Sequence, residues 1–218
     1  MADSDEKKED GRVVRAQKQR ESRRAAVLQA ARRVFAQKGY RNAGVADIIA
    51  RAGVARGTFY LYFASKQEIF LAIVNDFHGR VTRALEAVEA VATDASGAGT
   101  PAALQVSFRA WLGFFAAHRD ATRVILREAS SIDPRFEKGF TEVRQLAVTH
   151  FAARFRALQQ RGAVRASIDP DLAAHLQLGM FDELLNIYVL GDPSADLDAL
   201  ARKLADFEWS GVRPDRKE

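Results

Sequence analysis

Apolar residues recur along almost the whole chain three or four positions apart, which is the spacing of one face of an α-helix. Such faces run through residues 27–35, 45–52 and 69–88 and continue in the second half of the chain. No segment alternates between apolar and polar residues as a half-buried strand does. The pattern therefore predicts an all-α protein.

Residues that favour helix ends divide this pattern into about nine helices. Gly39 and Gly53 follow apolar faces at the position where a left-handed residue closes a helix. Ser65 and Glu68 have the spacing of a capping box. Three further starts combine a capping side chain with a following proline: Thr100–Pro101, Asp133–Pro134 and Asp169–Pro170. The predicted helices are residues 21–38, 45–52, 55–62, 66–91, 101–118, 121–130, 134–161, 170–190 and 195–209.

These helices fall into a small N-terminal domain and a larger one behind it. Residues 1–18 are strongly charged and are predicted to form a disordered arm. Residues 19–66 hold three predicted helices, and residues 67–210 hold the others in one helical bundle. The tail, residues 211–218, is predicted to be disordered.

Charge is distributed unevenly between these parts. The chain has a net charge of +5, but residues 1–66 carry 15 Lys and Arg against 7 Asp and Glu, a net +8. The remainder has a net charge of −3. A basic N-terminal part on a mildly acidic body indicates a nucleic-acid-binding module joined to a second module. The sequence leaves open whether the basic arm itself contacts DNA.

Composition excludes several classes of protein. The chain contains no cysteine, which excludes disulfides, thiol chemistry and zinc–thiolate sites. No apolar run approaches the roughly 18–20 residues that a membrane span needs. The first residues lack the apolar stretch of a signal peptide, so we expect a cytoplasmic protein with no membrane partner.

The segment 39–70 is the most informative part of the sequence. Two short predicted helices meet at Gly53 and a longer helix follows Ser65, which is the arrangement of a helix-turn-helix. In such a motif the second short helix lies in the major groove of DNA. We predict that the DNA contacts are made by Arg41, Ala55, Arg56, Gly57, Thr58, Tyr60, Leu61 and Lys66.

The roles of these residues follow from their side chains. Arg56 can donate two hydrogen bonds to a guanine edge, and a plain phosphate contact is equally compatible with its position. Thr58 can reach a phosphate or pack on a thymine methyl group. Tyr60, Lys66 and Arg41 can donate to phosphates. The other aromatic side chains of the segment are expected in the core: Tyr40, Phe59, Tyr62 and Phe63.

A set of residues within this segment forms a recognisable motif: Gly39-Tyr40, Val45, Ile48, Ile49, Ala52-Gly53-Val54, Gly57-Thr58-Phe59-Tyr60, Tyr62-Phe63, Lys66 and Ile69. With them the chain closely resembles the DNA-binding domain of the TetR family of bacterial repressors, over about 45 residues without a gap. The resemblance implies a repressor that binds a palindromic operator as a homodimer. It also implies a variable helical body that binds a small-molecule effector and dimerises through its last two helices.

The sequence departs from the family pattern just before the second helix. The family usually has a Thr/Ser pair there, which caps the helix and often contacts a phosphate, whereas this chain has Ala43 and Gly44. Asn42 or Gly44 is expected to act as a weaker cap. The resemblance therefore extends to the fold but not to this phosphate contact.

The body beyond residue 66 is rich in aromatic residues, which can line an apolar pocket or simply fill the core. Polar side chains within its apolar runs, such as Asp182, are further candidates for ligand recognition. We predict an apolar or aromatic ligand that contacts Trp111, Phe114, Phe115, His118, Glu128, Phe151, Phe181 and Asn186. We expect neither a metal ion nor another cofactor.

Apolar stripes on the last two predicted helices indicate a dimer interface. The stripe residues that we assign to it are Leu172, Leu176, Leu184, Tyr188, Leu197, Leu200 and Leu204. Two helices from each subunit would form a four-helix bundle, whose two-fold symmetry would match that of a palindromic operator.

Two other classes of function stay open. A helical enzyme would need a metal site or a catalytic motif, but no phosphate-binding loop or nucleophile elbow is present. The histidines lie on four different predicted helices: His78, His118, His150 and His175. A sequence-independent architectural DNA-binding protein would explain the basic arm but not the larger acidic body. We therefore predict a regulator rather than an enzyme.

Overall fold

The computed structural model describes the backbone of residues 2–94, 100–132 and 134–214 and most of their side chains. Within these ranges every regular element is a helix, which confirms the all-α prediction. The chain forms two compact units, Met1–Val74 and Asn75–Glu218. The sequence placed this boundary at residue 66, but the first two turns of the fourth helix pack in the first unit through Ile69, Phe70 and Ile73.

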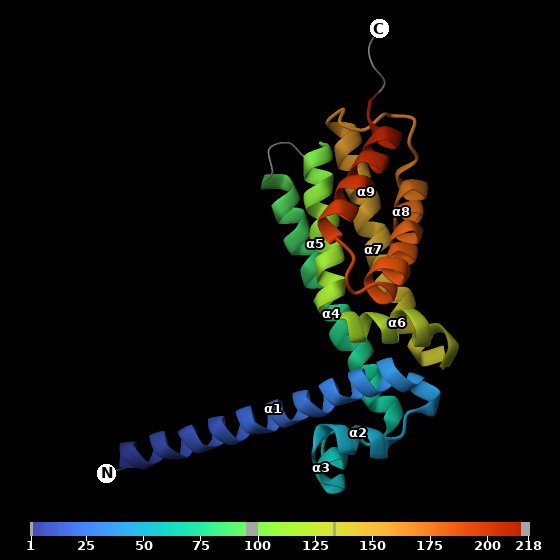
Figure 1. Ribbon diagram of the computed structural model, residues 1–218. Coiled ribbons are helices and arrows are strands. Elements are labelled where there is room, and N and C mark those ends of the chain that lie inside the picture. Colours follow the sequence, from blue (N-terminus) through green and yellow to red (C-terminus); the bar gives the residue numbers. More distant parts are fainter. Residues whose placement is uncertain (1, 95–99, 133, 215–218) are drawn as a thin grey trace. The chain divides into compact units, whose positions relative to one another are not determined.

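The first unit contains three helices and the start of a fourth (Figure 1): α1 (Ala2–Asn42), α2 (Val45–Ala52), α3 (Arg56–Tyr60) and α4 (Lys66–Asp94). The rings of Phe35, Tyr40 and Phe70 contact one another at centroid distances of 4.9–5.7 Å. Two of these contacts are edge-on, the geometry that aromatic pairs prefer. This aromatic cluster joins α1 to α4 and forms the centre of the small core.

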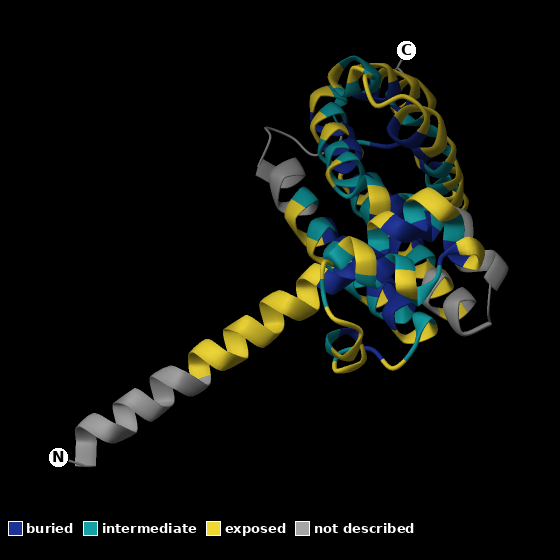
Figure 2. Ribbon diagram, turned by 60° about the horizontal axis from the view of Figure 1, so that its bottom comes forward, coloured by how far each residue is buried: buried dark blue, intermediate teal, exposed yellow. Residues whose placement is uncertain are grey.

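The prediction of a disordered arm over residues 1–18 is wrong for the described part, because α1 is helical from Ala2. Ten of residues 1–18 are Ala, Gln, Glu, Lys or Arg, which all favour helices. A helix already nucleated by the packed part of α1 also extends without a new nucleation cost. The side chains of residues 14–26 are all exposed, as the yellow segment in Figure 2 shows.

The predicted caps at Gly53 and Ser65 are confirmed, whereas Gly39 interrupts α1 and the helix ends only at Asn42. Gly39 (φ 73°) and Gly53 (φ 64°) both adopt positive φ values, which side chains other than glycine rarely tolerate. Ser65 caps α4 by accepting a hydrogen bond from the Glu68 amide at 3.1 Å. The carboxylate of Glu68 accepts from the amide of Ala64 at 2.5 Å, one residue earlier than in a regular capping box.

The second unit is a helical bundle that includes the rest of α4 (Figure 1). Its other helices are α5 (Pro101–Ala117), α6 (Arg119–Ile132), α7 (Pro134–Gln160), α8 (Pro170–Leu184), the π-helix η1 (Leu185–Gly191) and α9 (Leu197–Val212). The main packing pairs are α5 with α9 and α7 with α8. Thr100 and Asp169 cap α5 and α8 as predicted, whereas Asp133 lies outside the described residues.

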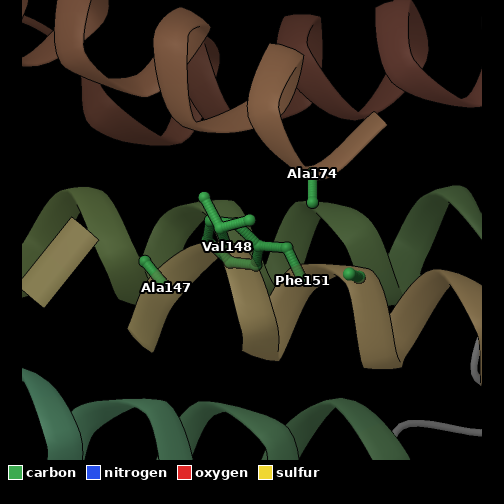
Figure 3. Close-up of a cluster of buried hydrophobic side chains, with 5 residues drawn as sticks. Ala147, Val148, Phe151 and Ala174 are labelled. Atoms are coloured by element: carbon green, nitrogen blue, oxygen red, sulfur yellow. The ribbon is translucent and has the colours of Figure 1, made fainter. Parts of the chain in front are cut away.

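Small residues let α7 and α8 pack closely. Ala147, Val148, Phe151 and Ala152 of α7 form a buried cluster with Ala174 of α8. Figure 3 shows Ala174 pointing toward the α7 residues. A large residue at position 174 would push the two helices apart, since cores are close-packed.

Two predicted boundaries in the second unit differ from the structure. The helix predicted over residues 170–190 changes at Leu185 from α to π, and the carbonyl of Leu190 accepts a hydrogen bond from Arg123 at 3.1 Å. Seven residues are too few for apolar spacing to distinguish the two helix types. The last helix continues to Val212 rather than ending at residue 209, and so enters the tail predicted to be disordered.

A buried polar network joins α7, α8 and α9. Arg154 donates to the Glu208 carboxylate at 3.0 Å and to the side-chain oxygen of Gln177 at 3.4 Å. The side-chain nitrogen of Gln177 donates to the other carboxylate oxygen of Glu208 at 3.0 Å. Burial raises the pKa of Glu208, while its contacts with Arg154 and Gln177 act in the opposite direction. Removal of the guanidinium would therefore leave a buried carboxylate without its cation.

Arg154→Met is expected to lower the free energy of unfolding by about 3–5 kcal/mol at neutral pH. The folded protein holds the Glu208 proton more tightly than the unfolded chain does, so the loss should shrink as the pH falls and Glu208 becomes protonated. Urea unfolding at neutral and mildly acidic pH measures both effects. Arg156→Met is the control, because Arg156 forms an exposed α7–α8 pair with Asp171 and should cost less than about 1 kcal/mol. Equal losses in the two variants would contradict this prediction.

Candidate DNA-binding surface and ligand cavity

The orientation of α3 is set by two buried aromatic side chains. Phe59 and Phe63 are 0% and 1% exposed, whereas Tyr60 and Leu61 are 45% and 72% exposed. Exposed apolar and aromatic side chains of this size on so short a helix indicate a contact surface. The sequence predicted these four orientations correctly, whereas Tyr62, expected in the core, and Thr58, expected on the exposed face, are both half-buried.

The other predicted recognition residues lie on the same outer face. Ala55 is the N-cap of α3, and Ala55, Arg56 and Gly57 are exposed while Thr58 is half-buried. The guanidinium of Arg56 lies over the Tyr60 ring at 5.8 Å from its centroid. A Cβ atom at Gly57 would meet nothing within 4 Å, so this position leaves open space for another molecule.

At the start of α2 only the reciprocal half of a capping box is present, because Gly44 has no side chain that could accept a hydrogen bond. Gly44 is the N-cap, and its amide donates to the carboxylate of Asp47 at 2.9 Å. Lys38 of α1 pairs with the same carboxylate at 2.6 Å. This hydrogen bond from Lys38, followed by the one from the Gly44 amide, lowers the pKa of Asp47. The side chain of Asn42 instead donates to the carbonyl of Lys38, so Asn42 does not cap α2.

Lys66 is held by the chain itself. Its ammonium group donates to the carbonyl oxygens of Tyr40 and Ala43 at 2.9 Å each, and lies 3.5 Å from that of Arg41. It also lies over the Tyr40 ring at 4.4 Å. A lysine has three N–H donors, so these carbonyls account for all of them. The geometry thus shows Lys66 joining the start of α4 to the end of α1.

The exposed part of α1 adds positive charge to the first unit. Residues 14–26 carry the five cations Arg15, Lys18, Arg20, Arg23 and Arg24 and one anion, Glu21. Arg24 lies over the Phe63 ring at 5.0 Å, where the packed part of the helix begins. The segment has no apolar face, so its chemistry suits a polyanion rather than a membrane surface.

The second unit contains an apolar cavity with a volume of about 70 Å³. Four residues predicted to bind a ligand line it: Trp111, Phe115, Phe151 and Phe181. Its other lining residues are Phe77, Val81, Thr122, Ile125, Leu126, Val143, Arg144, Ala147, Leu178, Asp182 and Leu185. A largely apolar cavity with a few polar groups is the usual form of a small-molecule site.

Three other predicted ligand residues lie outside the cavity lining. Phe114 packs against Phe77, Trp111 and Phe115. His118 lies with Nδ1 2.8 Å from the Phe114 carbonyl oxygen and Nε2 3.3 Å from an Arg80 nitrogen.

The last of the three, Asn186, is exposed and donates to the carbonyl of Asp182 at 3.0 Å. The side chain of Glu128 is outside the described residues.

Arg144 is a charged group of the cavity that was not among the residues predicted from the sequence. It forms an ion pair with Asp182, which was among the predicted polar candidates. Arg144, Ala147 and Phe151 stand at i, i+3 and i+7, the spacing of one helix face. A cation on the apolar stripe of α7 was the signal that could have revealed it.

The α8 and α9 surfaces expose several large apolar side chains. Leu172, Leu176 and Tyr188 of the predicted interface are exposed, as are Ile187 and Phe207. Leu176 and Phe207 also line an open groove that α8 and α9 share. The remaining predicted interface residues are less exposed, since Leu184, Leu197 and Leu200 are half-buried and Leu204 is buried in the subunit core.

Two further features concern alternative functions. Within the described side chains, no three His, Asp or Glu residues gather as ligands of a metal ion would. No helix in the described ranges combines the length and the hydropathy of a membrane span.

Comparisons with known proteins agree with this geometry. Residues 27–73 match the family model of bacterial regulatory proteins, tetR family. The chain is 25% identical to the fatty acid metabolism regulator protein of Bacillus subtilis (strain 168), over 89% of this chain and 98% of the relative.

Two solved structures share the fold. FadR of Bacillus halodurans, a fatty acid degradation regulator, has a TM-score of 0.74 at 23% identity, covering 88% of this chain and 97% of that one. FadR of Bacillus subtilis, solved in complex with stearoyl-CoA, has a TM-score of 0.71 at 24% identity, covering 87% and 99%.

The outward-facing α3, the helical body and these similarities together define a DNA-binding, ligand-responsive transcriptional regulator. Residues 27–73 form the DNA-binding domain of the TetR family of bacterial regulatory proteins.

Lys66→Met is expected to lower the free energy of unfolding by about 1–3 kcal/mol, because three carbonyls lose a charged donor. DNA affinity should fall for all sequences alike without a change in its salt dependence. A direct phosphate contact would instead lower the salt slope by about one. Unfolding curves and DNA titrations at several salt concentrations measure both. Exposed Gln67→Met is the matched control and should change neither.

Proposed function

We propose that this chain is a homodimeric repressor that binds a palindromic operator and leaves it when a small apolar ligand enters the second unit. The burial of Phe59 and Phe63, which turns Arg56, Tyr60 and Leu61 outward, is the observation that carries the DNA-binding part. A repressor of this kind acts on chromosomal DNA, which places it in the cytoplasm.

The proposed DNA contacts follow from the exposed face of α3. Arg56 reads a base edge or a phosphate, Thr58 packs on the groove wall, and Tyr60 donates to the backbone. The backbone at Ala55 and at Gly57 approaches the duplex closely, because neither of these two residues has a large side chain. Arg41 is exposed at the end of α1 and supplies a flanking cation. We assign Lys66 to positioning α4 against α1 rather than to a phosphate, because its donors are occupied.

Selection of bound sequences from a random DNA pool tests the proposal. A palindromic site with two equal half-sites should be enriched, and its affinity should exceed that for competitor DNA by about 10³-fold or more. A pool that stays random while the protein still binds DNA would favour the sequence-independent alternative. No salt-sensitive binding to any duplex would refute DNA regulation altogether.

Arg56→Ala is expected to cost about 1–3 kcal/mol of operator affinity and to relax the preference at one base position. The exposed guanidinium is the only long cationic side chain on the described face of α3, so its loss removes a donor that reads bases. Binding to operators with each base changed in turn measures the preference. Arg51→Ala, which removes an exposed cation from α2, should leave the preference at every position intact. An unchanged profile in Arg56→Ala would show that this residue contacts only phosphate.

The ligand is proposed to be apolar or aromatic, and a fatty acyl compound fits best. The cavity is lined by aromatic and aliphatic side chains with few polar atoms. A fatty acid regulator is among the relatives that align with nearly the whole chain, and one protein of the same fold was solved with stearoyl-CoA. Fatty acyl chains and small aromatic compounds are therefore the first ligands to titrate.

A single helix connects the cavity to the DNA-binding unit. Phe77 and Val81 line the cavity and belong to α4, whose first residue, Lys66, is tied to the end of α1. A ligand that displaces this helix would change the spacing of the two recognition helices in a dimer. The ligand must bind the released state more tightly, and coupling of about 1–3 kcal/mol is typical.

The dimer is proposed to form through the exposed residues of α8 and α9. Leu176→Arg combined with Phe207→Arg is expected to give a monomer, because two cations would be buried in the interface. Operator affinity should fall by about 10²–10⁴-fold as the second half-site is lost. Sedimentation and DNA titration measure these outcomes. Val106→Arg, at an exposed apolar residue of α5, should remain a dimer, and a double variant that also stays dimeric would exclude this interface.

A further inference from the structure

The cavity of the second unit contains one ion pair on an otherwise apolar wall. We propose that Arg144 is the binding site for the anionic head of an amphiphilic ligand, and that Asp182 holds the guanidinium in place until the ligand arrives. The apolar chain of the ligand would fill the aromatic part of the cavity. This inference rests on the proposed function, in which the cavity binds the effector.

The lining residues leave few groups that can recognise a charge. Apart from the indole N–H of Trp111, only Thr122, Arg144 and Asp182 among the described lining residues have polar side-chain groups. The hydroxyl of Thr122 lies 3.1 Å from the His118 carbonyl oxygen and 3.3 Å from that of Phe115, so its donor is committed to the backbone. Arg144 is the one cation among these residues, and it therefore determines which ligand charge the cavity accepts.

The exposure of the ion pair places it at the edge of the cavity. The side chains of Arg144 and Asp182 are 38% and 28% exposed, whereas Phe151 and Phe181 of the same cavity are buried. An amphiphile bound with its chain among the aromatic rings would therefore have its head near solvent, beside Arg144. This orientation avoids the cost of burying a charge in the apolar part.

The chemistry of the pair selects an anion. A guanidinium has five N–H donors in a planar fork that matches the oxygens of a carboxylate or a phosphate. An incoming anion would meet the like charge of Asp182 and compete with it for Arg144. Binding would thus exchange an ion pair between α7 and α8 for one between α7 and the ligand. The same anion could be the carboxylate of a free fatty acid or a phosphate of an acyl thioester.

Three probes that share a ten-carbon acyl or alkyl chain distinguish a carboxylate from a phosphate as the bound anion: decanoate, decanol and decanoyl-CoA. Quenching of the fluorescence of Trp111, which lines the cavity, reports binding. The wild-type protein should bind decanoate or decanoyl-CoA about 10- to 100-fold more tightly than decanol, the range for a hydrogen bond to a charged group. A preference for decanoate identifies the carboxylate, and a preference for the thioester alone identifies its phosphates.

Two substitutions at the pair and one control test the roles of the residues. Arg144→Gln should abolish the preference for the anion and leave the affinity for decanol unchanged, which also shows that the cavity is intact. Asp182→Asn should tighten the binding of the anion, because a competing carboxylate is removed. Arg156→Gln is the matched control, since Arg156 and Asp171 form another α7–α8 ion pair, at 2.5 Å, away from the cavity lining. Its preference should equal that of the wild type.

Several results would overturn the inference. Equal affinity of the wild type for all three probes would exclude a subsite for an anion, while leaving an apolar effector site in place. Retention of the preference in Arg144→Gln would exclude this arginine. Failure of every probe to bind, in a protein that still selects a palindromic operator, would refute the effector cavity and the head site together but not the DNA-binding function.

Discussion

The burial of Phe59 and Phe63 is the interaction on which the DNA-binding surface depends. Both rings are almost fully buried in a unit whose core is small, so α3 cannot rotate without exposing them. Because these two side chains are fixed in the core, the opposite face of α3 is exposed. That face carries Arg56, Gly57 and Tyr60. A helix of five residues has little stability of its own, so this packing also keeps it folded.

A second constraint fixes where α4 begins. The ammonium group of Lys66 binds carbonyl oxygens at the end of α1, and Phe70 packs against Phe35 and Tyr40 one turn later. These carbonyls belong to the end of α1, where a side-chain donor such as the lysine commonly binds the last carbonyls of a helix. The DNA-binding unit is therefore joined to α4 by a polar and an aromatic contact, and α4 also lines the cavity through Phe77 and Val81.

The sequence predicted local features better than it predicted interactions between distant residues. The predicted helix caps were correct because each cap acts on atoms only a few positions away in the chain: Gly53, Ser65, Thr100 and Asp169. The burial of Phe59 and the exposure of Arg56 and Tyr60 on α3 were predicted correctly, but the partial burial of Thr58 was not.

Contacts between residues far apart in the chain could not be derived in this way. Lys66 lies in a position typical of a phosphate contact, and nothing local shows that it binds carbonyls more than twenty residues earlier. Leu204 has the spacing of an interface stripe, but α9 directs it into the subunit core.

The arginines of α7 illustrate why residue type alone does not define a role. Arg154 pairs with the buried Glu208, so its charge is needed to balance a carboxylate that has lost its water. Arg156 pairs with the exposed Asp171, where solvent already screens both charges. Arg144 has an intermediate exposure and lies beside an apolar cavity. Among these three arginines, only Arg144 combines partial shielding from solvent, which keeps its charge attractive to an anion, with enough exposure for the anion to reach it. For this reason we propose Arg144 as the residue that binds the charged group of the effector.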